Sequence, residues 1–192
     1  MMGFKSTVMY KKGELGERIV DEHLLRGGTF IPYAPVMDNA HVFDRLIASK
    51  DKRQLMVVEV KAIDARDFYP DTGISIKHYR EYKQIQDRYN LDVWVLFVDA
   101  KNKCIYGNTL SKLDKPTVIR HGKRRINYPL IQDNFAAIGK KIIYFPLANM
   151  KRVKELDDQE VQELNEHNNK GYKQDLSWKK GYAEWKNNQF NT

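Results

Sequence analysis

The sequence predicts a single α/β domain with a mixed central β-sheet and flanking helices, followed by a helical C-terminal extension. Two strongly apolar segments, residues 55–62 and 92–99, have the length and β-branched content of buried strands. Between them, residues 75–89 repeat apolar side chains at the three- and four-residue spacing of a helix. A strand, a helix and a second strand in this order form a crossover, so we expect the two strands to be parallel neighbours.

Length and composition indicate one main core with appendages. The chain has 192 residues, and we divide it into a main domain, residues 1–150, and a charged, aromatic-containing extension, residues 151–192. Apolar residues make up 42% and charged residues 30%, which excludes the disordered and membrane-embedded classes. Cys104 is the only cysteine, and no apolar run approaches the roughly 20 residues of a spanning helix. We therefore expect a cytoplasmic protein with no membrane attachment.

The first third of the chain should contain one helix and two strands. Residues 12–26 carry a partial apolar stripe, and the two glycines that follow are typical of a helix end. Residues 29–33 and 41–48 are predicted strands. The second of them is joined to strand 55–62 by a short polar connection, which favours an antiparallel hairpin.

A loop is predicted over residues 63–73, where Pro70 interrupts regular structure. The helix that follows has a possible N-cap in Ser75 and a possible end at Asn90. Further elements are predicted in order: a strand over residues 104–108, a hairpin over 118–128, a strand over 142–146, a surface helix over 151–168, and a helical aromatic stripe at Trp178, Tyr182 and Trp185.

Glu59 and Lys61 place two charges inside the otherwise apolar strand 55–62. Residues two positions apart in a strand share a face, so both side chains should project from the same side of the sheet. Burying such charges costs several kcal/mol each unless they have partners. The rest of the chain should therefore supply partners for this pair.

Hairpin register supplies one partner. If residues 51–52 form the turn, Ile47 pairs with Met56 and Asp44 lies opposite Glu59. Two carboxylates on directly opposed strand residues repel each other, and a divalent cation between them would offset the repulsion. The first helix offers Glu14 and Glu17, which either face this site or only complement the helix dipole.

The order of these features resembles that of the PD-(D/E)XK nuclease superfamily over residues 10–100. Phe43-Asp44 corresponds to the "PD" element, with phenylalanine in place of proline, and Glu59-Val60-Lys61 corresponds to the (D/E)XK element. Lys12-Gly13 followed by Glu17-Arg18 is similar to the start of archaeal Holliday-junction resolvases, in which a glutamate of the first helix serves the metal site. That similarity favours Glu17 over Glu14.

The resemblance implies a restriction endonuclease-like core and a Mg²⁺-dependent nuclease, with Mn²⁺ as a substitute and no small-molecule cofactor. Lys61 would orient or deprotonate the attacking water, or stabilise charge on the phosphate. The implied residues are Asp44, Glu59, Lys61 and Glu17 for catalysis, Asp44, Glu59, Val60 and Glu17 for the metal, and Gln84, Gln86 and Glu14 as supporting residues.

The formal net charge of +8 favours an anionic partner, nucleic acid first and a membrane surface second. A two-stranded ribbon fits a DNA groove, so the basic tip of the predicted hairpin is the best candidate contact. No base-reading motif is visible, so we expect recognition of DNA shape and backbone. The candidate nucleic-acid contacts are His121, Lys123, Arg124, Arg125, Lys140 and Lys141.

We expect an endonuclease selective for branched or junction DNA, acting as a homodimer because symmetrical cutting of two strands needs two sites. The alternatives are a restriction-type or repair nuclease, an RNA-directed nuclease, and a catalytically inactive nucleic-acid-binding protein on the same scaffold. Clustered charges in a strand pair argue against the inactive alternative, because a binding module gains nothing from them.

Overall fold

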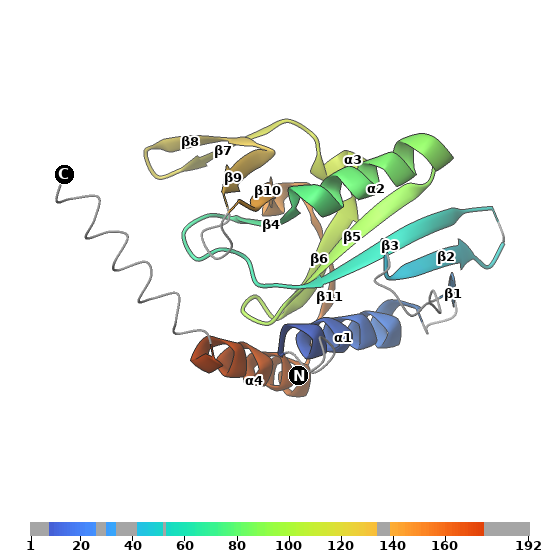
Figure 1. The fold of residues 1–192 in the computed structure, drawn as a ribbon, viewed down its shortest axis with the longest axis horizontal. Coiled ribbons are helices and arrows are strands. Elements are labelled where there is room, and N and C mark those ends of the chain that lie inside the picture. Colours follow the sequence, from blue (N-terminus) through green and yellow to red (C-terminus); the bar gives the residue numbers. More distant parts are fainter. Residues whose placement is uncertain (1–7, 26–29, 34–41, 52, 134–138, 175–192) are drawn as a thin grey trace.

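The computed structural model describes residues 8–25, 30–33, 42–51, 53–133 and 139–174. These residues form the predicted fold class, a mixed central β-sheet with helices on its faces (Figure 1). The helical segments are α1 (Val8–Val20), which continues as the π-helical η2 (Asp21–Leu25), then α2 (Ile76–Tyr89), α3 (Leu110–Leu113), the 3₁₀ turn η3 (Leu147–Asn149) and α4 (Asp158–Gln174). None of the described helices is both long and apolar enough to span a membrane.

The central sheet has six strands in the order β1-β2-β3-β5-β6-β11. A three-stranded sheet, β4-β10-β9, and a two-stranded hairpin, β7–β8, complete the fold. The strands are β1 (Phe30–Tyr33), β2 (Arg45–Ser49), β3 (Leu55–Ala62), β4 (Asp71–Ser75), β5 (Asp92–Asp99), β6 (Cys104–Thr109), β7 (Thr117–His121), β8 (Arg124–Tyr128), β9 (Leu130–Asp133), β10 (Lys141–Pro146) and β11 (Lys151–Glu155).

The hairpin and the crossover around β3 are both confirmed. β2 pairs antiparallel with β3, with Ile47 opposite Met56 as the predicted register requires. β5 lies parallel to β3 on its other side, connected through α2. Ser75 caps α2 by accepting a hydrogen bond from the His78 amide, and Asn90 ends it in the left-handed conformation at φ 52°.

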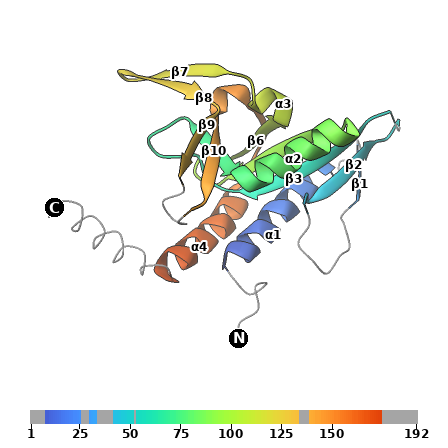
Figure 2. The ribbon, with the colours of Figure 1, turned by 45° about the horizontal axis from the view of Figure 1, so that its top comes forward.

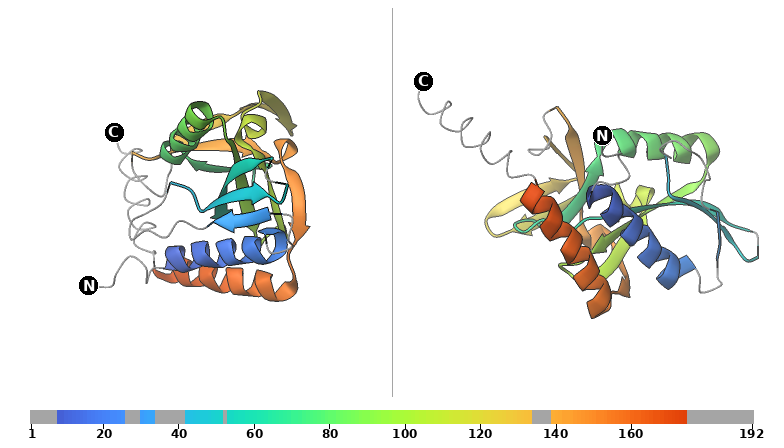
Figure 3. Two further views of the ribbon diagram at one scale, coloured as in Figure 1. Left: turned by 90° about the vertical axis from the view of Figure 1, so that its right-hand side faces the viewer. Right: turned by 60° about the horizontal axis from the view of Figure 1, so that its bottom comes forward.

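Successive side chains of β3 point to opposite faces of the sheet, so the strand contributes to a separate core cluster on each face. Val58 and Val60 belong to the cluster that includes residues of α1 and α4, whereas Val57 packs with Tyr82 of α2. Figure 3 shows the resulting layers, with α1 and α4 side by side below the sheet and α2 above it. Glu59 and Lys61 share the parity of Val57, so they lie on the α2 face.

Two segment predictions are wrong in ways that depend on distant partners. The loop after β3 ends at Pro70, because Asp71–Ser75 pairs with β10. That pairing needs Gly73, since a Cβ there would lie 2.4 Å from the carbonyl oxygen of Ile143. Residues 151–155, predicted as helix, form β11 and extend the central sheet beyond β6. Both partners are remote in sequence, and no local pattern reveals them.

The first helix begins earlier than predicted, at Val8, and its predicted end beyond Leu25 lies outside the described residues. Strand 41–48 is also shorter than predicted: β2 begins at Arg45, so Asp44 precedes the strand, and His41 is outside the described range. The predicted aromatic stripe from residue 178 also lies outside it.

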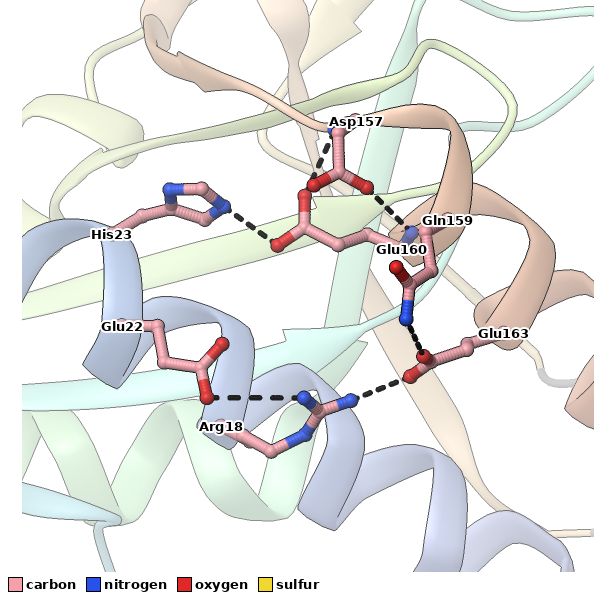
Figure 4. A network of polar contacts seen from close by, with 7 residues as sticks. All are labelled: Arg18, Glu22, His23, Asp157, Gln159, Glu160 and Glu163. Atoms are coloured by element: carbon pink, nitrogen blue, oxygen red, sulfur yellow. Dashed lines mark hydrogen bonds and ion pairs between the residues drawn. The ribbon is translucent and has the colours of Figure 1, made fainter.

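Polar contacts join α4 to α1 and η2 (Figure 4). Arg18 Nη2 donates to Glu163 at 2.5 Å, and His23 Nε2 lies 2.6 Å from Glu160 Oε1. Asp157 and Glu160 form a reciprocal capping box, with backbone-to-carboxylate distances of 2.8 and 2.9 Å. The described part of the extension therefore packs on the main core, while the division at residue 150 stays a prediction.

Candidate active site

β3 carries the two charges on which the site prediction depends. Glu59 is 3% exposed, and the Lys61 Nζ donates to its Oε1. The side chain of Lys61 stays 30% exposed, so the lysine reaches solvent while its partner does not. The buried hydroxyl of Tyr82, on α2, also hydrogen-bonds to the Glu59 carboxylate. Glu59 therefore has a lysine cation and a phenol as its polar neighbours.

Asp44 reaches this pair from the residue just before β2. Its Oδ2 accepts a hydrogen bond from the Val60 amide at 2.7 Å, which fixes the carboxylate against the backbone of β3. The charge of Asp44 acts on Glu59 and raises the pKa of that glutamate. The structure thus brings Asp44, Glu59 and Lys61 together, although Asp44 is held by a side-chain bond and not by the strand ladder.

Burial is the main reason why the pKa of Glu59 rises from 4.5 to about 7, and Asp44 adds to it, while Lys61 and Tyr82 oppose the rise. Between these pH values the folded protein binds more protons than the unfolded chain. The contribution of Glu59 to the free energy of unfolding is therefore complete below about pH 4.5 and is lost as the pH rises through about 7.

This shift predicts a difference in pH dependence between the wild type and Glu59→Gln, which cannot ionise. Without divalent cations, the free energy of unfolding of the wild type should fall by up to about 3 kcal/mol between pH about 5 and 8, relative to the variant. Urea unfolding at several pH values measures how the free energy of unfolding of each protein depends on pH. Parallel curves for the two proteins would show that Glu59 ionises normally.

Glu17 approaches Asp44 from α1. The helix packs so closely on β3 that a Cβ on Gly16 would lie 2.8 Å from the Cβ of Ala62. Burial and the Asp44 charge raise the pKa of Glu17, and Arg45 opposes this. Glu17 therefore lies within reach of the Asp44 charge, and its role at a metal stays a prediction.

Arg45 is a residue of this site that the sequence analysis missed. Its Nη1 donates to Glu17 at 3.0 Å and to the Asp44 carbonyl at 2.7 Å. Its Nε and Nη2 donate to Asp21 at 3.1 and 2.8 Å. Its position directly after Asp44 was visible, but its partners lie on α1 and η2, about 25 residues earlier in the chain. Arg45 neutralises the acids of the α1 face.

The three supporting residues are placed differently. Glu14 is exposed and lines a groove between α1 and α4. Gln84 is exposed, because a helix turns by about 200° between Tyr82 and Gln84. Gln86 returns to the side of Tyr82, is half-buried, and its Oε1 has no hydrogen-bond partner among the described residues. Of the two glutamines, only Gln86 points inward.

His78 is a second missed residue. It is half-buried one turn before Tyr82, with the two rings 6.1 Å apart. Burial and the charge of Lys61 lower its pKa, and the charge of Asp44 acts on it in the opposite direction. His78 lies four residues before Tyr82, a spacing that puts both side chains on one helix face, and this spacing is the sequence signal that could have revealed it.

The donor set fits Mg²⁺ better than a metal that needs an all-protein cage. Nowhere in the described ranges do three His, Cys, Asp or Glu side chains gather as a ready metal-binding group. Glu17 is paired with Arg45, which leaves Asp44 and Glu59 as the two carboxylates beside β3. Mg²⁺ is commonly held by one or two carboxylates together with waters and substrate phosphates. The residues present match that pattern.

The predicted nucleic-acid contacts fall in two places. The hairpin β7–β8 is confirmed, with His121 opposite Arg124 across a turn in which Gly122 has φ +59°. His121, Lys123, Arg124 and Arg125 are all exposed at its tip. Lys140 and Lys141 are exposed at the start of β10, which belongs to the three-stranded sheet.

No protein-family model and no curated protein matches this chain. Among solved structures, the chain is similar to Hjc, a Holliday junction resolvase from the archaeal hyperthermophile Archaeoglobus fulgidus. The two are 13% identical, with a TM-score of 0.41 over 60% of this chain and 88% of the resolvase chain. A likeness at this level assigns no function, which has to be inferred from the residues of the site.

Proposed function

We propose that the protein is a Mg²⁺-dependent nuclease that hydrolyses phosphodiester bonds in DNA. The observation that carries this proposal is the convergence of Asp44, Glu59 and Lys61 beside one strand, with Asp44 bonded to the Val60 amide and Lys61 bonded to Glu59. An exposed surface ion pair would need neither the burial of Glu59 nor a second carboxylate beside it.

Asp44 and Glu59 would hold the cation, and the Val60 carbonyl is a further candidate ligand. The bound Mg²⁺ supplies positive charge for phosphate oxygens and lowers the pKa of a water molecule. Lys61 keeps its stem beside Glu59 and its ammonium group near solvent, where it can donate to a phosphate or orient water. Glu17 and Arg45 adjust the charge around Asp44 from the opposite face of the sheet.

The choice of DNA is supported by the net charge of +8 and by the exposed basic tip of β7–β8. The hairpin lies at the end of the domain opposite β1 and β2, and β3 runs between these two ends (Figures 1 and 2). Branched or junction DNA, and a homodimer with two active sites, are the preferred substrate and assembly within this proposal.

The test is a cleavage assay on labelled branched, duplex and single-stranded DNA, with RNA included, with and without Mg²⁺. We expect Mg²⁺-dependent cleavage by the wild type and its loss in Asp44→Asn. In the wild type, but not in Asp44→Asn, Mg²⁺ should also raise the unfolding temperature, because a ligand that binds only the folded state stabilises it. Binding of DNA without cleavage under any condition would support a catalytically inactive binding protein.

The matched control is Asp87→Asn, which removes an exposed carboxylate from α2 that pairs only with Lys83 at 3.0 Å among the described contacts. This variant should cleave DNA and respond to Mg²⁺ like the wild type. Cleavage that survives in Asp44→Asn would contradict the site.

A further inference from the structure

A groove of about 460 Å³ lies between the loop after β3 and the tip of the β7–β8 hairpin. Its lining residues are Phe68, Tyr69, His121, Lys123 and Arg124. It therefore combines two aromatic side chains from one segment with an imidazole and two cations from another. Neither segment belongs to the Asp44–Glu59–Lys61 site.

Phe68 is the most unusual member of this groove. The residue is 78% exposed, the highest value among the large apolar residues of the described chain. What distinguishes Phe68 is its place in the groove, where an exposed aromatic ring is combined with the cationic Lys123 and Arg124. The nearest acid in sequence, Asp67, is paired with Lys101 at 2.7 Å.

Tyr69 is held in place beside Phe68. The Arg66 guanidinium lies 4.4 Å from the centre of the Tyr69 ring and 3.7 Å from that of Tyr144. Arg124 Nη1 donates to the Tyr69 hydroxyl at 3.3 Å, and the Tyr69 and His121 rings are 6.2 Å apart. These contacts connect the loop to the hairpin and fix the wall of the groove.

The base of the loop is anchored as well. The buried carboxylate of Asp99 accepts hydrogen bonds from the Ala65 amide at 2.8 Å and the Tyr106 hydroxyl at 2.6 Å. The buried Asp71 holds Arg66 through two contacts of 2.6 Å. An aromatic platform that is ordered before binding loses less conformational entropy when a ligand stacks on it.

We propose that this groove binds an unpaired nucleotide segment of DNA, with a base stacked on Phe68 and flanking phosphates on Lys123 and Arg124. Single-strand sites combine these parts: aromatic faces for bases and a cationic groove for the backbone. The seven residue-to-residue steps from Lys61 to Phe68 span at most about 25 Å, so one DNA molecule can reach both places.

The inference rests on the proposed function for its consequence. The groove would select substrates in which duplex DNA meets unpaired bases, such as branches and flaps, for cleavage at the Asp44–Glu59–Lys61 site. Stacking on Phe68 is independent of the metal, so binding and cleavage can be tested separately.

The experiment measures fluorescence anisotropy of labelled oligothymidylate, in EDTA, with the full chain. A matched oligonucleotide with abasic residues keeps the phosphates but removes the bases. The wild type should bind oligothymidylate about tenfold more tightly than the abasic strand, and Phe68→Ala should abolish this difference. Phe68→Trp should retain it, because the indole ring also stacks. Lys123→Ala should weaken binding to both strands and lower the salt dependence.

Tyr89→Ala is the matched control, because Tyr89 is another exposed aromatic beside an arginine, with Arg88 5.7 Å from its ring centre. It should bind both strands like the wild type. Equal binding of the two strands by the wild type, or an unchanged preference in Phe68→Ala, would overturn the groove assignment. Tighter binding of oligouridylate than of oligothymidylate would overturn the choice of DNA.

The two proposals fail in different ways. If Phe68→Ala loses the preference for oligothymidylate over the abasic strand, and the wild type does not cleave DNA in Mg²⁺, the groove proposal stands and the nuclease proposal is refuted. Cleavage lost in Asp44→Asn, with Phe68→Ala indistinguishable from the wild type on every strand, would leave the nuclease and refute the groove.

Discussion

Lys61→Met is expected to lower the rate of DNA cleavage by a factor of about 10² to 10⁴, the usual size of a lost general acid–base or charge-stabilising group. Methionine preserves much of the aliphatic stem that packs beside β3, so the fold should persist. The remaining neighbour, Glu59, is 3% exposed, and its pKa of about 7 lets it bind a proton when its cation is removed. Loss of activity would then report chemistry and not unfolding.

Single-turnover cleavage at saturating enzyme, with Mg²⁺, gives the rate directly, and thermal unfolding checks the fold. Lys112→Met, an exposed lysine on α3, is the matched control and should cleave like the wild type. DNA binding in EDTA should also be nearly unchanged in Lys61→Met. A rate within about threefold of the wild type would remove Lys61 from the proposed chemistry.

Asp71→Asn is expected to destabilise the folded protein by about 3–5 kcal/mol. Asp71 is fully buried, and its two carboxylate oxygens face Arg66 Nε and Nη2 at 2.6 Å each. Its Oδ2 also accepts from the Tyr128 hydroxyl at 2.5 Å. An amide carries no charge and puts a donor where an acceptor is needed, so the guanidinium loses its counter-ion in a largely buried place.

Urea unfolding measures this loss, and the unfolding temperature should fall by roughly 10 °C for a chain of this size. Asp67→Asn is the matched control, because Asp67 lies four residues before Asp71, in the loop that leads into β4, and pairs with Lys101, but its side chain is 77% exposed. Its effect should stay below about 1 kcal/mol. Similar losses in the two variants would contradict the role of burial at Asp71.

Asp71→Asn also bears on the groove. Arg66 packs against the Tyr69 ring, so releasing the guanidinium should loosen the aromatic wall and weaken binding of unpaired DNA. Arg66 thus connects the buried Asp71 network to the surface groove, a connection that the local sequence could not show.

The sequence alone determined the elements whose signals are local. β3 has the predicted bounds, the Ser75 cap and the left-handed Asn90 enclose α2, and the Ile47–Met56 register follows from a short turn. From that register came the prediction that Asp44 and Glu59 meet, and the structure brings them together at β3. Alternation along a strand and the length of a turn are properties of neighbouring residues, so they can be read directly.

Tertiary structure decided the contacts between distant segments that no local pattern or connection predicts. Arg45 meets Glu17 across two elements, β4 forms because β10 arrives some seventy residues later, and β11 extends the central sheet at β6. The same holds for the groove, whose aromatic and basic walls are more than fifty residues apart in the chain. Such contacts are selected by the free energy of the whole core, because each one repays chain entropy only when the others have formed.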